Sequence, residues 1–152
     1  MIMIPVLILQ IFLFPLVASS LMNVWVDARR TLALQNVASH LGSTVQQIYF
    51  ALNHPTIPIG TTASNSPGLP RSIDNYCYTG NATIRAVGPT PGSGQVLEIT
   101  VQLVTAGITA TTSVILGSNA QWNQTSVFKS DSASPCIYAN KTQTSIQLYF
   151  GG

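Results

Sequence analysis

The first 26 residues, Met1 to Val26, contain no charged side chain, and a helical pattern that starts there continues without a break to about Asn53. A bilayer span needs only about 20 apolar residues, whereas a continuous helix from Ile2 to Leu52 reaches roughly 75 Å at 1.5 Å per residue. A bilayer therefore accommodates only the first half of such a helix, and the second half must pack elsewhere.

The second half of this segment carries a single apolar stripe. Its large apolar residues recur at three- and four-residue steps, whereas Gln, Asn, Ser and His side chains occupy the remaining faces. The pattern predicts an amphipathic helix that ends at Asn53-His54-Pro55, because the residue before a proline resists the helical conformation. The residues of the stripe are Leu34, Val37, Leu41, Val45, Ile48 and Leu52.

The placement of positive charge constrains how this segment meets a membrane. A signal peptide begins with basic residues, and an anchor with an exported C-terminal domain keeps Lys or Arg on the inner side. Here the first basic residues, Arg29 and Arg30, follow the apolar run. We therefore expect that a short basic leader once preceded Met1 and has been removed. The other hypothesis is a signal peptide that is cut near residues 17–20.

The composition changes at Thr56, so we expect three parts in the chain. Residues 1–54 form the hydrophobic helix. Residues 55–70 are rich in Pro, Ser and Thr, which predicts an extended surface connector. Residues 71–152 form a β-rich exterior domain.

In the last part the hydrophobic period becomes two, as in a strand with one buried face. Residues 97–103 alternate in this way, and a turn at Ala106-Gly107 leads to a second alternating run, so the two runs predict a hairpin. Shorter candidate strands are 73–79, 82–87, 136–139 and 144–150. The predicted class is α+β, in which the long helix precedes a small antiparallel β-sandwich or partly open barrel.

This organisation resembles the mature type IV pilins. The resemblance is carried by the charge-free N-terminal helix, its amphipathic continuation to about residue 53 and the β-rich C-terminal domain. Bacterial type IV pilins typically have an acidic residue at the fifth mature position. This chain has Pro5 there and no acid before Asp27, so it is more similar to the archaeal pilins and archaellins.

The resemblance implies a life cycle as well as a fold. A prepilin peptidase removes the leader, the membrane stores the subunit, and a pilus assembly machinery polymerises it. The filament core is then a bundle of the N-terminal helices, and adhesion is the commonest use of such filaments.

The first half of the helix needs cover for a physical reason. Each large apolar side chain is worth about 1.5–3 kcal/mol when it is buried instead of exposed, so lipid or other copies must surround this run. A run that is apolar on all sides suits a helical array of identical subunits. The residues expected to pack in the filament core are Ile4, Leu7, Leu9, Phe12, Phe14, Leu16 and Leu21, together with the six residues of the stripe.

A proline and three polar residues interrupt the apolar run in different ways. Pro15 lies in the helix interior, where it removes one backbone hydrogen bond and predicts a kink near residues 11–15. Gln10 is polar, as are Ser19 and Ser20. Their simpler interpretation is hydrogen bonding to a helix backbone or a neighbouring helix, and the alternative for Gln10 is that it sets the register between subunits.

The two cysteines, Cys77 and Cys136, both lie in the β-rich domain. Metal sites need more ligands and redox pairs need closer spacing, so the pattern favours a structural disulfide over free thiols. Such a bond stabilises a domain by roughly 4 kcal/mol and indicates an oxidising compartment. The glycosylation acceptor pattern occurs at Asn81, Asn123 and Asn140, all in the same domain, and predicts covalent glycans there.

Charged residues make up only 7% of the chain, and the net charge of +2 lacks the clustered basic stripe that nucleic-acid binding requires. The two histidines, His40 and His54, lie on or just after the helix, and no phosphate-binding loop or nucleophile elbow is present. We therefore expect no enzymatic activity, no cofactor and no metal. The aromatic residues of the domain are expected in the core or between subunits, and the alternative is a binding patch. They are Tyr76, Tyr78, Trp122, Tyr138 and Tyr149.

We therefore expect a structural subunit that forms a helical homopolymer outside the cell, and the resemblance implies that the filament serves in adhesion or surface attachment. Two alternatives stay open. One is an archaellin of a swimming filament, which differs in its motor and not in its subunit. The other is a membrane-anchored extracellular binding module that does not polymerise, which the apolar stripe disfavours because a tether outside the membrane needs no such stripe.

Overall fold

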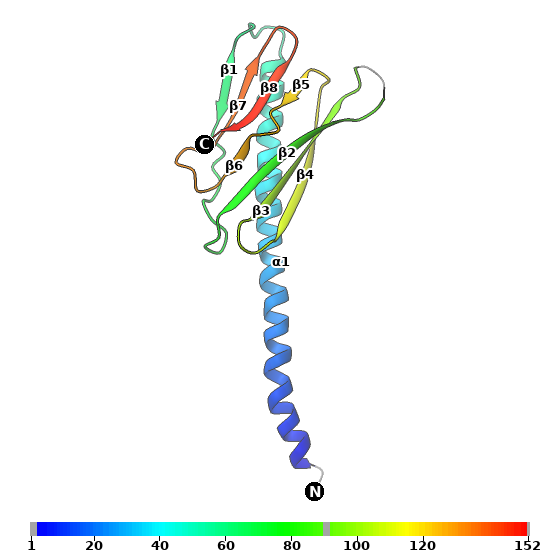
Figure 1. The fold of residues 1–152 in the computed structure, drawn as a ribbon, viewed down its shortest axis with the longest axis vertical. Coiled ribbons are helices and arrows are strands. Elements are labelled where there is room, and N and C mark those ends of the chain that lie inside the picture. The colour runs from blue at the N-terminus through cyan, green and yellow to red at the C-terminus, as the bar shows by residue number, and fades with distance from the viewer. Residues whose placement is uncertain (1–2, 90–91, 152) are drawn as a thin grey trace.

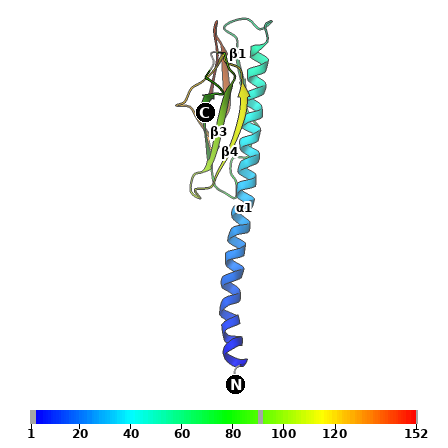
Figure 2. The same cartoon turned by 90° about the vertical axis from the view of Figure 1, so that its right-hand side faces the viewer.

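The computed structural model describes residues 3–89 and 92–151, with side chains from residue 8 onward. Within these residues one long helix precedes eight strands, and the strands lie beside the C-terminal half of the helix while its N-terminal half projects alone (Figures 1 and 2). The predicted α+β class is confirmed. The elements are α1 (Met3–Asn53), β1 (Thr62–Asn65), β2 (Tyr78–Ala86), β3 (Gln95–Leu103), β4 (Thr109–Leu116), β5 (Ala120–Trp122), β6 (Val127–Lys129), β7 (Cys136–Lys141) and β8 (Ile146–Gly151).

The strands form two four-stranded sheets, in the orders β1-β7-β8-β5 and β4-β3-β2-β6, which together make a partly open sandwich. The predicted hairpin is confirmed as β3 and β4, where Leu97 pairs with Val114 and Gly107 supplies a positive φ of 66° in the turn. The pairing is antiparallel except between β5 and β8, which are parallel. Strands β7 and β8 correspond to the last two predicted runs.

Several strand predictions need correction. The expected connector contains β1, which pairs with β7 along the edge of a sheet. The candidate at residues 73–79 is a turn followed by the start of β2, and β2 continues through the next candidate. The three-residue strands β5 and β6 were not predicted. Short edge strands form because backbone groups that are distant in sequence pair with them. A local alternation pattern cannot predict that pairing.

The apolar stripe of α1 is buried inside the chain's own domain. Leu34, Leu41 and Val45 are 0% exposed and belong to one core cluster with residues of both sheets, and the other three stripe residues are buried in the same cluster. Our expectation that these six side chains pack in a filament core is therefore wrong. The periodicity identified the buried face correctly, but it could not show that the partner is the following β domain.

The helix lies close against strand β4. A Cβ atom built on Gly42 would lie 2.9 Å from Cγ1 of Val114, so only glycine permits this approach without a shift of that side chain. Gln35 and Gln46 donate side-chain hydrogen bonds of 3.2 Å to the carbonyl oxygens of Thr111 and Ile115 in β4. The helix therefore covers an edge strand that would otherwise present unpaired backbone groups.

The C-terminal end of α1 is fixed to the domain by polar contacts. Asn119 donates a hydrogen bond of 2.9 Å to the side chain of Asn53, and Lys141 Nζ donates one of 2.9 Å to the carbonyl oxygen of His54. A cation near the last carbonyls of a helix also interacts favourably with its dipole. The helix ends at Asn53, as its sequence predicts, and no linker separates the projecting half from the domain.

The buried tyrosine Tyr78 should make the domain less stable at alkaline pH. Burial raises its pKa to about 12, from an ordinary value of 10, and its hydroxyl donates to the carbonyl of Pro70. Because the unfolded chain loses this proton first, the stability is fully present below pH 10 and falls as the pH rises towards 12, by about 2 kcal/mol. Urea unfolding followed by near-ultraviolet circular dichroism measures this loss. Tyr78→Phe should reduce the alkaline slope, and an unchanged slope contradicts the assignment.

Candidate assembly surface

The projecting part of the helix, residues 8–26, is a rod of exposed apolar side chains that we call the apolar shaft. Phe14 is 77% exposed and Trp25 is 72% exposed, and the predicted packing residues Leu9, Phe12, Leu16 and Leu21 are exposed as well. Ile4 and Leu7 lie outside the described side chains. The shaft has no cover from its own domain, so a single chain in water leaves it unpacked.

The shaft has the dimensions of a membrane segment. Its 19 residues span about 28 Å at 1.5 Å per residue, close to the thickness of a hydrocarbon core. Helix α1 is long and apolar enough to cross a bilayer, and the most apolar stretch of it is not buried in the domain. The shaft is therefore consistent with membrane insertion, and the same surface suits packing against other apolar helices.

The polar and proline residues of the shaft interrupt it only locally. Ser19 Oγ donates a hydrogen bond of 3.1 Å to the carbonyl of Leu16, which confirms the simpler interpretation for that serine. Gln10 and Pro15 line an open groove with the neighbouring Phe14. Helix α1 continues through Pro15, so the proline does not end it, and the predicted bend stays a prediction.

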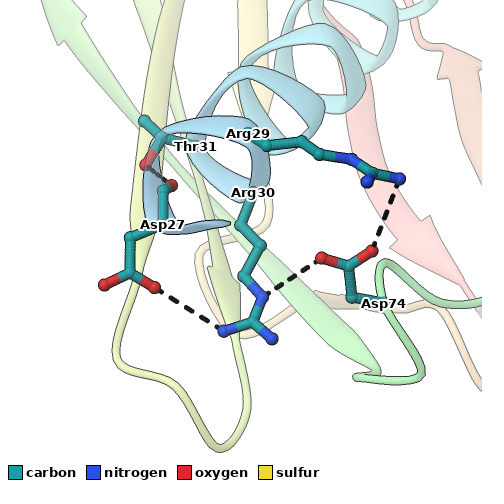
Figure 3. A network of polar contacts seen from close by, with 5 residues as sticks. All are labelled: Asp27, Arg29, Arg30, Thr31 and Asp74. Atoms are coloured by element: carbon teal, nitrogen blue, oxygen red, sulfur yellow. Dashed lines mark hydrogen bonds and ion pairs between the residues drawn. The ribbon is translucent and has the colours of Figure 1, made fainter. Parts of the chain in front are cut away.

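A cluster of charged residues marks where the shaft meets the domain (Figure 3). Arg30 lies at its centre: its Nε is 3.2 Å from Oδ2 of Asp74, and its Nη1 is 3.6 Å from Oδ1 of Asp27. Arg29 Nη2 lies 3.9 Å from Oδ1 of Asp74, and the Arg30 guanidinium carbon is 5.0 Å from the centre of the Tyr76 ring. We call these five residues the collar. Both arginines therefore pair with carboxylates of their own chain.

A tight turn presents Asp74 to the helix. The backbone groups of Ile73 and Tyr76 exchange two hydrogen bonds of 2.9 Å, and the two residues between them, Asp74 and Asn75, have φ values of 49° and 68°. These features are those of a type I′ turn, in which Asp and Asn tolerate the left-handed conformation. Sequence reasoning missed Asp74 and Tyr76 as partners of the arginines. The Asp-Asn pair between two apolar residues was the available signal for the turn.

Removal of the Asp74 charge should weaken the junction between helix and domain. Asp74→Asn keeps a residue that tolerates the turn but abolishes the ion pairs, and we expect a loss of about 0.5–1 kcal/mol in the free energy of unfolding. The loss should shrink at high salt, because Arg30 and Asp74 are only partly buried. Urea unfolding at low and high salt tests this. Asp131→Asn, an exposed aspartate outside the collar, serves as the control, and equal effects of the two changes contradict the assignment.

The expected disulfide is absent from the structure. Cys77 and Cys136 are free, and they precede or begin strands of different sheets, because β2 follows Cys77 and β7 starts at Cys136. The number and spacing of cysteines in a sequence do not determine the distance and orientation of their side chains in the fold, on which a disulfide depends. The Cys136 thiol raises the pKa of the adjacent Tyr138. In the described part of the chain no cluster of three or more His, Cys, Asp or Glu side chains is placed to hold a metal ion.

The three glycosylation acceptors lie at different kinds of position. Asn81 is exposed in the middle of β2, and Asn140 is half-buried in β7. Asn123 is exposed just after β5, and its side-chain oxygen accepts hydrogen bonds from the backbone and hydroxyl of Thr125. Glycosylation of these residues stays a prediction.

The aromatic residues of the domain divide between core and surface. Tyr78 and Trp122 are buried, as the core interpretation predicts, and Tyr76 lies under Arg30 in the collar. Tyr138 and Tyr149 are exposed and stack on each other on the outer side of β7 and β8. The sequence alone could not make this distinction, because it depends on the register of each strand.

A long apolar helix that precedes and partly enters a small β domain is a pilin-like architecture. Comparison of the chain with protein-family models, with curated proteins and with solved structures finds no match.

Proposed function

We propose that this chain is the structural subunit of an extracellular type IV-like filament of the archaeal pilin kind, used for adhesion or surface attachment. The observation that carries the proposal is the apolar shaft, which is exposed on all sides and continues as one helix into the β domain. In a filament the shafts would form the core, and the β domains would form the outer surface.

Burial of the shaft supplies the driving force for assembly. Most of its large apolar side chains are more than half exposed in the single chain, and each contributes about 1.5–3 kcal/mol when it is fully buried. In lipid this burial is already achieved, so the membrane would store the subunit. Outside lipid, the shafts of other copies of the chain would bury this apolar surface.

The rigid connection between shaft and domain also favours a filament. The helix passes into the core without a linker, and Leu34, Leu41 and Tyr49 bury it there against the sheets. The domain therefore keeps a fixed orientation relative to the shaft, which a regular array of subunits requires. A tethered binding module has no need of that fixed orientation.

A membrane-anchored binding module is the second candidate. The apolar stripe no longer counts against it, because the stripe packs inside the domain. The span of the shaft, about 28 Å for residues 8–26, matches one crossing of a bilayer. An archaellin of a swimming filament would share the subunit design of the first proposal and differ in the motor that turns it.

Electron microscopy of material sheared from the cell surface tests the proposal, together with mass spectrometry of whatever filaments appear. Thin filaments with this chain as their main component are the expected result. Recovery of the chain only in the membrane fraction, without filaments, would overturn the proposal in favour of the anchored module. If filaments are found, loss of surface attachment in cells that lack this protein would support the adhesive use.

A further inference from the structure

The outer face of the sheet β1-β7-β8-β5 carries a paired aromatic surface. Tyr138 of β7 and Tyr149 of β8 are direct cross-strand partners, their ring centres are 5.3 Å apart, and their planes differ by 15°. The two side chains are 36% and 38% exposed. One face of each ring is therefore covered by its neighbour, which holds both rings in place, while part of each stays open to a ligand.

A cleft of about 360 Å³ lies beside this pair, where β8 runs parallel to β5. Tyr149 is one of its walls, and the others come from both strands. The sheet order places β7 on one side of β8 and β5 on the other, so Tyr138 supports Tyr149 from the side away from the cleft. The lining residues are Gln121, Trp122, Asn123, Gln147, Leu148 and Tyr149.

The polar side-chain groups of the cleft are neutral: three amides, the Tyr149 hydroxyl and the Trp122 indole N–H. Gln121 and Gln147 face each other across the two strands, and Asn123 follows at the end of β5, where its backbone N–H donates to the carbonyl of Leu148. Side-chain amides carry both donors and an acceptor. The Gln121 oxygen already accepts from Ser145 Oγ at 3.3 Å, and the Asn123 oxygen accepts from Thr125, so the amide donors of Gln121 and both groups of Gln147 are the ones that face a ligand. None of the residues that line the cleft is charged. Such a lining matches a ligand with many hydroxyl groups and no net charge.

We propose that this cleft binds a neutral carbohydrate. The apolar C–H face of a sugar ring would lie against Tyr149, and its hydroxyls would exchange hydrogen bonds with the amides of Gln121 and Gln147. The volume lies near the lower end of the range of about 300–1,000 Å³ for small-molecule sites, which suits a terminal sugar better than a long chain.

Other ligand classes fit this surface less well. An acidic sugar or a phosphate would find no cation among the lining residues, and a lipid tail would leave the amides without partners. Lys141 of β7 is not a lining residue, and its Nζ donates to the carbonyl of His54 instead of facing a ligand in the cleft. Binding at the cleft is a property of one domain, so the inference goes beyond the filament proposal and does not depend on polymerisation.

The test uses the full chain solubilised in detergent, applied to an array of neutral, sialylated and sulfated oligosaccharides. We expect binding to neutral glycans, which Tyr149→Ala and Gln147→Ala each weaken by about tenfold or more. Tyr149→Phe keeps the ring and should retain most of the affinity. Gln102→Ala, on the exposed side of β3, is the matched control and should change nothing.

Two results would overturn the inference. One is the lack of binding to any neutral glycan, or binding to anionic glycans alone. The other is binding that persists in Tyr149→Ala while only the oligomeric state changes, because the face would then be a contact between copies. Near-ultraviolet circular dichroism of each variant confirms that its domain is folded. A monomeric chain that still binds neutral glycans would support this inference even if the filament proposal fails.

Discussion

Replacement of Leu16 by lysine is expected to abolish filament assembly and to leave the β domain folded. Leu16 lies in the middle of the apolar shaft and is 66% exposed in the single chain, so it makes no contribution to the core of the domain. A lysine at the centre of an apolar span costs about 2.5–3.5 kcal/mol on insertion scales. In a bundle of identical helices every copy carries the same buried charge, so the cost recurs at each subunit.

Electron microscopy of sheared material measures filament yield, and near-ultraviolet circular dichroism of the purified chain reports on the domain. Ile59→Lys is the matched control, because Ile59 is 64% exposed on the domain and lies outside the shaft. Filaments should persist in the control and disappear in Leu16→Lys. Normal filaments in Leu16→Lys would contradict a core made of shafts.

Replacement of Leu41 by alanine is expected to produce the largest loss of domain stability, about 2–5 kcal/mol in the free energy of unfolding. Leu41 is 0% exposed, lies in the core cluster, and has a methyl group 3.7 Å from the position of a Cβ on Gly80 in β2. Truncation there removes apolar contacts and leaves a cavity between helix and sheet. Urea unfolding in detergent, followed by near-ultraviolet circular dichroism, provides the measurement.

Leu21→Ala is the matched control for this change, because it removes the same atoms from the same helix at a position that is 66% exposed. We expect no change in the unfolding of the domain, and a weakening of assembly instead. Equal losses of stability from the two substitutions would show that the two halves of the helix do not have separate roles.

The sequence predicted the elements whose signals are local. The helix end at Asn53 follows from the Asn-His-Pro stop, and the β3–β4 hairpin follows from two alternating runs around Gly107. The exposed apolar shaft follows from the lack of charge before Asp27. In each case the residues that determine the structure are close together in the sequence, so one sequence without homologues is enough to predict it.

The remaining features depend on contacts between distant segments. The stripe around Leu41 identified a buried face, yet only the folded chain shows that residues of both sheets pack against it. Arg30 could not be paired with Asp74 without knowledge of the turn that brings that carboxylate to the helix. Cys77 and Cys136 were predicted to form a disulfide from their number and compartment, whereas both are free in the structure.

The central claim is that α1 has two roles: residues 8–26 join copies of the chain, and Leu34 to Leu52 hold the β domain. Cryo-electron microscopy of the filaments at side-chain detail tests it most directly. We predict that the shafts pack against one another along the filament axis and that the β domain of each subunit covers its own stripe. A filament held together by β domains, with the shafts apart, would contradict the claim.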